Sequence, residues 1–169
     1  MANFFDRTFD PIRDKDLVHV VAESSRLKAT TAGHIYDLKM VEDTDNGTIV
    51  AIGKHVEGQV YEAAKYAAGK APYLVLTPPL AYNGRKIYSD EKFFYNAAGE
   101  IARAYELHVD DIYTVSKEAF GTSTPEVGKF VDATYTVAAS ATEGAFAAEI
   151  IEEVNYTNSV SYRLRVVAL

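Results

Sequence analysis

The chain has 169 residues and no cysteine, so it is the size of one domain and cannot form a disulfide, a thiolate zinc site or a cysteine nucleophile. Hydrophobic residues make up 48% and charged residues 24%, a composition typical of an ordinary globular protein. The net charge of −7 repels phosphates and anionic lipid headgroups, so we expect neither nucleic acid nor a membrane as a partner. Apolar runs long enough for a signal peptide or a membrane span are missing, and we expect synthesis in the cytoplasm without export through a membrane channel.

Residues 1–16 combine phenylalanines with alternating charges and are predicted to form an extended N-terminal arm, because the phenylalanine spacing fits no face of a helix or strand. The arm either folds back on its own domain or docks on a neighbouring subunit. In the second case its aromatic side chains fill pockets and its arginines pair with carboxylates. The candidate partner-binding residues are Phe4, Phe5, Arg7, Phe9, Ile12 and Arg13.

Residues 17–169 are predicted to form a single β domain. An apolar, β-branched run over residues 17–22 predicts a first strand. Residues 33–41 and 48–52 flank an Asp-Asn-Gly sequence, which predicts two strands joined by a tight turn. Residues 72–76 predict a buried strand that two prolines terminate.

Two central segments combine helix-forming residues with a context that favours strands. Residues 60–68 are rich in alanine but span only about two helical turns, so a helical turn and an extended stretch are nearly equal alternatives. Propensity alone predicts a helix over residues 100–107, whereas context favours two strands around a turn at 108–111. Residues 121–128 are predicted to be a loop.

Strict alternation of apolar and polar residues over 131–139 and 160–168 predicts two half-buried strands in the C-terminal third. Residues 146–156 fit either an amphipathic helix or a strand, and we favour the strand because a three-stranded meander buries its neighbours without a long crossover. The expected fold is therefore mainly β: a compact antiparallel barrel or sandwich with an extended N-terminal arm and at most one or two short helices.

The four histidines, at positions 19, 34, 55 and 108, are isolated from one another and show neither His-x-x-x-His nor Glu-x-x-His spacing. A histidine making one hydrogen bond in each case is favoured over a metal site assembled from distant positions. The serines and glycines match neither Gly-x-Ser-x-Gly nor a phosphate-binding loop. These patterns predict a protein without catalytic, cofactor-binding or metal-binding residues.

Paired carboxylates do not change that expectation. Asp110-Asp111 and Glu152-Glu153 are adjacent pairs, and neighbouring residues of a strand point to opposite faces, so turn and solvent-facing roles are favoured over acid–base chemistry. Residues 43–47 superficially match the start of a calcium loop, but the glycine is one place early and the downstream glutamate is missing. A hairpin turn is the better interpretation.

Three segments, YLVLTPPLAYN at 73–83, EIARAYELHVDDIYTVS at 100–116 and VSYRLRVV at 160–167, resemble small head proteins of tailed bacteriophages, namely capsid decoration or cement proteins. The resemblance lies in a pattern of strand, polar turn, strand and closing β meander. It implies a structural virion protein, not an enzyme, that binds the exterior of the assembled shell between major-capsid subunits, as a homo-oligomer that can be a trimer, and stabilises it. It implies no cofactor.

The alternative is a carbohydrate- or receptor-binding β module of a phage particle, in which the 12 tyrosines would provide a stacking surface.

Overall fold

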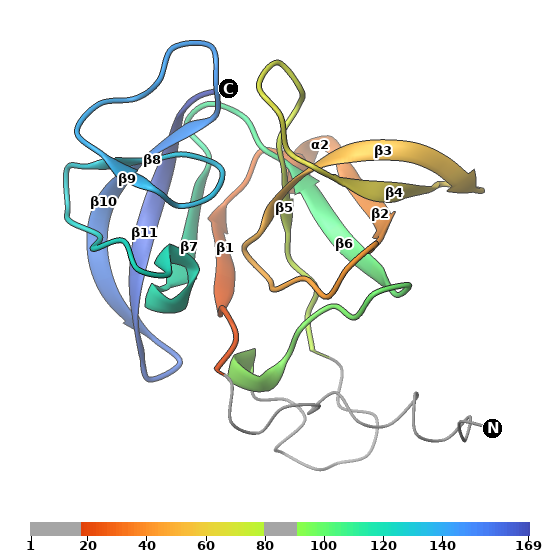
Figure 1. Ribbon diagram of the computed structural model, residues 1–169, viewed down its shortest axis with the longest axis horizontal. Coiled ribbons are helices and arrows are strands. Elements are labelled where there is room, and N and C mark those ends of the chain that lie inside the picture. Colours follow the sequence, from red (N-terminus) through yellow and green to blue (C-terminus); the bar gives the residue numbers. More distant parts are fainter. Residues whose placement is uncertain (1–17, 80–90) are drawn as a thin grey trace.

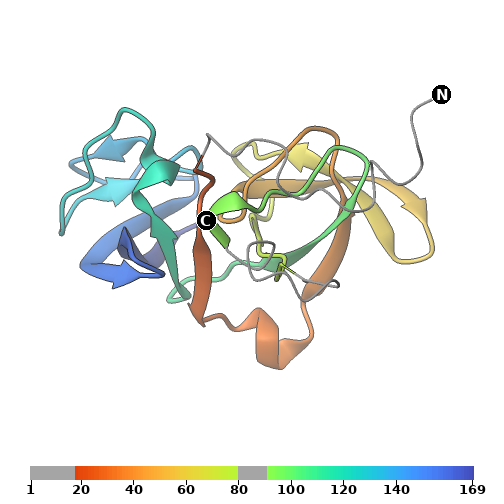
Figure 2. The same cartoon turned by 90° about the horizontal axis from the view of Figure 1, so that it is seen from below.

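The computed structural model describes residues 18–79 and 91–169, and it confirms a mainly β fold with one short α-helix among these residues. The predicted arm, with all six of its candidate partner-binding residues, lies outside the described residues. A closed barrel and a separate sheet lie side by side, as Figures 1 and 2 show from two directions. Within the described segments, no helix is long and apolar enough to cross a membrane.

The barrel closes through five strands in the order β2-β4-β3-β5-β6. All neighbouring pairs are antiparallel except β2 and β4, which run parallel. The strands are β2 (Ile35–Lys39), β3 (Ile49–Glu57), β4 (Val60–Lys65), β5 (Tyr73–Val75) and β6 (Ile101–Glu106).

The second layer is a six-stranded antiparallel sheet with the order β1-β7-β11-β10-β8-β9. Its longest element is the β10–β11 hairpin. The strands are β1 (Ala22–Arg26), β7 (Ile112–Ser116), β8 (Phe130–Val131), β9 (Val137–Ala138), β10 (Ala147–Tyr156) and β11 (Ser159–Ala168).

The barrel is inserted into the sheet along the chain, because β1 precedes the barrel, β7 follows it, and the two strands pair with each other. The chain enters the barrel through the short helix α2 (Ala29–Ala32), which ends at Gly33 in the left-handed conformation with φ of 75°. Two 3₁₀ turns, η2 (Glu91–Phe93) and η3 (Lys117–Phe120), precede β6 and follow β7.

Two hydrophobic clusters hold these layers together. The larger cluster joins the inner face of the sheet to the outer face of the barrel, where Ile49, Leu74 and Leu76 are buried. The smaller cluster fills the barrel and includes Ala63, Ala102 and Ala104 among larger side chains. Small residues let strands approach across a narrow barrel, and this explains why alanine-rich segments form strands here.

Several predictions are confirmed. Residues 60–65 adopt the extended alternative as β4, and the context-based interpretation of residues 100–116 is correct, with β6 and β7 flanking a turn at 108–111. The strands predicted at 72–76, 146–156 and 160–168 are also present, as β5, β10 and β11.

The predicted hairpin between residues 33–41 and 48–52 is wrong, because β2 pairs with β4 and β6, whereas β3 pairs with β4 and β5. The Asn-Gly segment does turn, but its groups bind other parts of the chain. The buried side chain of Asn46 hydrogen-bonds both backbone polar groups of Thr77. The Gly47 N–H donates to the Val75 carbonyl at 2.7 Å, so the turn ties β3 to β5.

The single strand predicted over residues 131–139 is also wrong, because a turn separates β8 from β9. The Asp132 carboxylate accepts the backbone N–H groups of Thr134 and Thr136 at 2.8 and 3.0 Å. Aspartate side chains that bind the backbone two residues on are typical turn formers. Tyr135 then takes φ of 59° and its buried hydroxyl donates to the Gly47 carbonyl at 2.5 Å.

The first strand lies later than predicted: it runs from Ala22 to Arg26 and overlaps the predicted residues 17–22 only at Ala22. The backbone just before β1 does not pair with another strand. The His19 N–H donates to the Lys92 carbonyl at 2.8 Å, and the Val20 N–H donates to the Asp45 carboxylate at 3.2 Å. Leu17 lies outside the described residues.

Candidate functional site: a histidine and glutamate cluster at the barrel mouth

Three potential metal ligands, His34, Glu106 and His108, meet at one end of the barrel, and we call them the mouth cluster. Their position follows from strand alternation. The buried residues Leu38 and Ala104 face the barrel interior, so His34 and Glu106, an even number of residues away, continue these inward-facing rows to the barrel end.

Strand register brings residues far apart in sequence to the same place. Ile35 pairs with Tyr105, and the Glu106 N–H donates to the His34 carbonyl at 3.1 Å, so His34 and Glu106 lie opposite each other. His108 follows Glu106 by two residues as the chain leaves β6. The cluster thus joins both connections between the sheet and the barrel.

The polar atoms of the mouth cluster are close together. His34 Nδ1 lies 3.0 Å from Glu106 Oε2, and His108 Nε2 lies 3.8 Å from Glu106 Oε1. The two imidazole rings are tilted, with centroids 5.8 Å apart. The side chains are 47% exposed for His34, 22% for Glu106 and 32% for His108, so the cluster is partly exposed to solvent.

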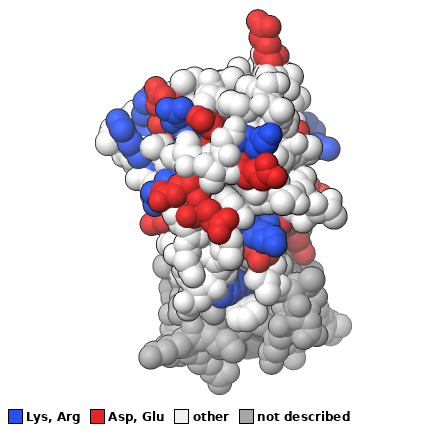
Figure 3. Space-filling model, turned by 90° about the vertical axis from the view of Figure 1, so that its left-hand side faces the viewer, with Lys and Arg blue, Asp and Glu red and all other residues white. Residues whose placement is uncertain are grey.

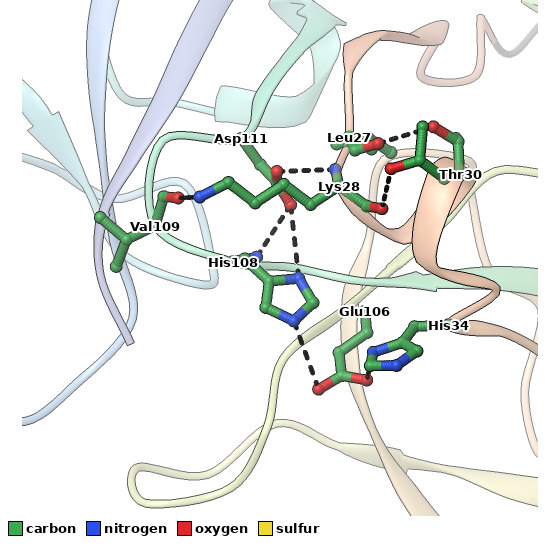
Figure 4. Close-up of polar contacts among 9 residues, drawn as sticks. Leu27, Lys28, Thr30, His34, Glu106, His108, Val109 and Asp111 are labelled. Carbon is green, nitrogen blue, oxygen red and sulfur yellow. Dashed lines mark hydrogen bonds and ion pairs between the residues drawn. The ribbon is translucent and has the colours of Figure 1, made fainter.

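Asp111 contacts the cluster through His108, as Figure 4 shows. Its carboxylate is buried and accepts the backbone N–H of Lys28 at 2.9 Å and that of His108 at 2.8 Å. The Lys28 side chain reaches across to the Val109 carbonyl. These bonds hold the two chain connections together. Asp111 Oδ2 lies 3.9 Å from His108 Nδ1. The His108 Nδ1 atom is buried and has no hydrogen-bond partner.

Tyr73 lies next to Glu106 on the neighbouring strand of the barrel. It is buried, pairs with Glu106 across β5 and β6, and its ring meets that of Tyr36 edge-on at a centroid distance of 5.2 Å. Burial, followed by the negative charge of Glu106, raises the pKa of Tyr73 to about 12. Tyr73 therefore remains a neutral phenol beside the carboxylate at neutral pH.

A second feature is an open cleft of about 1210 Å³ between the barrel and the sheet. Tyr66 and Tyr95 line it together with the acidic residues Asp43 and Asp132. It also contains a histidine–aspartate pair, in which His19 Nδ1 lies 2.8 Å from Asp45 Oδ1. Within the described residues the mouth cluster is the one group of three histidine or carboxylate side chains whose ligand atoms converge.

Two of the four histidines, His19 and His55, each make one hydrogen-bonding contact outside the cluster, as expected. His19 binds Asp45, and His55 Nε2 lies 3.0 Å from the Gly58 carbonyl oxygen. The expectation misses the convergence of His34 and His108. The signal that could have found it is the Glu-x-His pair at 106 and 108, because residues two apart share one side of an extended chain, whereas the spacings tested are helical.

The third feature is the projecting end of the β3–β4 hairpin, visible at the right of Figure 1. Residues 53–59 are exposed, and β5 pairs only with Ile49 and Val50 of β3. Among the described residues, no strand pairs with residues 53–57 on the side away from β4. This stretch is an unpaired strand edge that carries the exposed side chain of Val56.

Comparison with protein-family models, with curated proteins and with solved structures finds no match to this chain.

Proposed function

We propose that the chain is a capsid decoration protein, which binds the exterior of an assembled major-capsid lattice and stabilises it without catalysing a reaction. The observation that carries the proposal is the unpaired β3 edge at residues 53–57, which is exposed at the far end of the barrel from the sheet. A free edge can accept an additional strand, so a neighbouring subunit could extend the barrel by main-chain hydrogen bonds.

The resemblance of residues 73–83, 100–116 and 160–167 to phage decoration proteins supports the same proposal. The N-terminal arm, residues 1–16, is the second proposed contact, through Phe4, Phe5, Arg7, Phe9, Ile12 and Arg13. We propose the major capsid protein as partner, with other copies of this chain in a homo-oligomer such as a trimer, and the virion exterior as the location.

The surface charge is compatible with this role. On the face shown in Figure 3, acidic and basic side chains alternate and no large patch carries one sign. Arg163 contacts Glu152 at 2.6 Å and Arg165 contacts Glu149 at 2.5 Å across β10 and β11. These ion pairs lie on the β10–β11 hairpin. The β3 edge proposed to bind a partner lies at the other end of the molecule.

Stabilisation of the shell follows from linkage. A protein that binds only the assembled lattice shifts the equilibrium toward that lattice by its own binding free energy. Because the sites repeat many times over a shell, modest contacts at each one add up to a large effect.

The test is binding of the purified full-length protein to undecorated shells of the phage that encodes it, measured by co-sedimentation and by electron microscopy. A Val56→Asp variant should bind at least 10-fold more weakly, because a carboxylate at the strand edge must be desolvated when a partner strand pairs there. Val127 is 59% exposed in a loop away from the hairpin, so Val127→Asp is the matched control and should bind like the wild type.

Deletion of residues 1–16 tests the arm separately: unchanged affinity would remove the arm from the proposal but leave the edge contact. If the wild-type protein does not sediment with shells, the decoration function is wrong.

The cleft favours the alternative of a carbohydrate-binding module. Its tyrosine rings can stack on sugar rings, and its carboxylates can accept hydrogen bonds from sugar hydroxyl groups. A glycan array separates the two functions. Specific glycan binding that a Tyr66→Ala variant loses, together with no binding to shells, would favour the carbohydrate module.

A further inference from the structure

We propose that the mouth cluster is a binding site for a divalent transition-metal ion of the zinc type, with His34, Glu106 and His108 as its three protein ligands. The inference goes beyond the proposed decoration function and does not depend on it, since all three residues belong to one chain and lie within the described structure.

The geometry is close to what such an ion requires. Ligand atoms about 2.0–2.2 Å from a tetrahedral centre are about 3.4 Å apart. The two separations in the structure, 3.0 Å from His34 Nδ1 to Glu106 Oε2 and 3.8 Å from His108 Nε2 to Glu106 Oε1, lie on either side of that value. One ligand atom from each of the three residues lies within 4.8 Å of the others, so small side-chain rotations suffice to close the site.

The donor set selects the class of metal. Two imidazole nitrogens and one carboxylate oxygen suit zinc, copper or nickel, whereas magnesium and calcium prefer oxygen ligands alone. Three protein ligands leave a fourth position for water or for a group from another molecule. The partial exposure of His34, 47%, places that fourth position on the solvent side.

The surroundings of His108 match those of a metal-bound histidine. Such a histidine usually donates its second ring N–H to a carboxylate or carbonyl, which fixes the ring and its tautomer. If His108 binds the ion through Nε2, its Nδ1–H points toward the buried Asp111 carboxylate, 3.9 Å away. The buried Nδ1 atom has no other hydrogen-bond partner, so a small shift of the ring on metal binding would supply the missing bond.

The position of the cluster gives the ion a structural consequence. His34 belongs to the connection that enters the barrel, and His108 belongs to the connection that leaves it. An ion held by both would cross-link the two connections next to the Lys28–Asp111 hydrogen bond. Because the unfolded chain does not hold these residues together, metal binding should stabilise the folded state.

The experiment uses the purified full-length protein after treatment with a chelator and dialysis. Isothermal titration with zinc sulfate should show one ion bound per chain, and magnesium under the same conditions should show no binding. At a free zinc concentration about 100-fold above the dissociation constant, the melting temperature should rise by roughly 5–10 °C.

Two variants test the ligands and one serves as a control. His34→Ala and Glu106→Gln should each weaken zinc binding at least 10-fold and abolish most of the rise in melting temperature. His55→Ala removes a histidine of the exposed β3 hairpin and should leave zinc binding unchanged. Far-UV circular dichroism confirms that each variant is folded, and Glu106→Gln keeps the side-chain size if His34→Ala does not fold.

The inference is overturned if the wild-type chain binds no zinc, or if zinc binding survives both ligand substitutions. It is equally overturned if His55→Ala weakens binding as much as His34→Ala, since the ion would then be held elsewhere. Because no shell takes part, these outcomes are independent of the decoration test.

Discussion

The sheet and the barrel are both built from strands, but their cores contain different side chains. The cluster under the sheet combines aliphatic side chains with several aromatic rings, and Phe120 meets Tyr135 and Tyr162 edge-on at centroid distances of 5.6 and 5.3 Å. In the barrel, alanines occupy central positions, and Ala102 and Ala104 are completely buried. Large side chains can fill the space between two layers, whereas a narrow five-stranded barrel needs small residues beside its larger ones.

This contrast predicts that the sheet depends far more on individual side chains. Replacing Phe120 with alanine removes a buried ring and its edge-on contacts and should lower the free energy of unfolding by about 4 kcal/mol. The barrel counterpart, Ala102→Gly, removes one buried methyl group and should cost about 1–2 kcal/mol. Urea unfolding measures both changes. If the two variants lose the same free energy of unfolding, the sheet does not depend more on individual side chains than the barrel does.

Gly47, in the turn before β3, lies close against the sheet. A Cβ atom there would lie 3.1 Å from Val115 and 3.2 Å from Ala22 of the sheet, and the residue has φ of 86°. Gly47→Ala should therefore lower the free energy of unfolding by about 2–3 kcal/mol, through left-handed strain and overpacking together.

Gly58 provides the matched control for that substitution. It also has positive φ, 55°, but a Cβ atom there meets nothing within 4 Å. Gly58→Ala should cost only about 1 kcal/mol, from backbone strain. If thermal and urea unfolding give the same loss of stability for both variants, the close contact of Gly47 with the sheet does not contribute to stability.

Alkaline pH should distinguish the two cores by their buried tyrosines. An unfolded tyrosine loses its proton near pH 10, whereas Tyr73 in the folded barrel keeps it until about pH 12. Between these values the folded state holds a proton that the unfolded state releases, so stability falls as the pH rises from 10 toward 12. The loss due to Tyr73 should reach about 2 kcal/mol.

Tyr73→Phe removes the barrel's share of that alkaline loss. Burial also raises the pKa of Tyr113 and Tyr135 in the sheet, so the variant should keep the sheet's share. Urea unfolding at pH 7 and at pH 11 gives the comparison. If the difference between the two pH values is the same in the variant and the wild type, Tyr73 does not retain its proton in the folded state.

The same contrast explains which parts of the fold could be predicted from the sequence. In β11 large apolar residues alternate with serine and arginine, so its period of two is visible locally. In β4 the alanines have a high helix propensity, and only packing against β2 and β3 makes the segment extended. The mistaken hairpin has a related cause, because the partners of β2 come from distant parts of the chain.

The mouth cluster depends on the same long-range pairing. His34 and Glu106 lie opposite each other because β2 pairs with β6. The local sequence does not predict this pairing or its register. Only Glu106 and His108 are close together in the sequence, and a test for ligands two residues apart would have identified these two of the three ligands. The remaining ligand requires the topology.

The insertion of the barrel between β1 and β7 has a consequence for the order of folding. Pairing Arg26 with Ile112 closes a very long loop, which is entropically costly while the intervening chain is unfolded. Once the barrel has formed, the pairing of β2 with β6 brings the two chain connections close together, where the Lys28–Asp111 hydrogen bond links them, and little further ordering is required. The barrel should therefore act as a template that assembles early, with the edge strand β1 joining the sheet last.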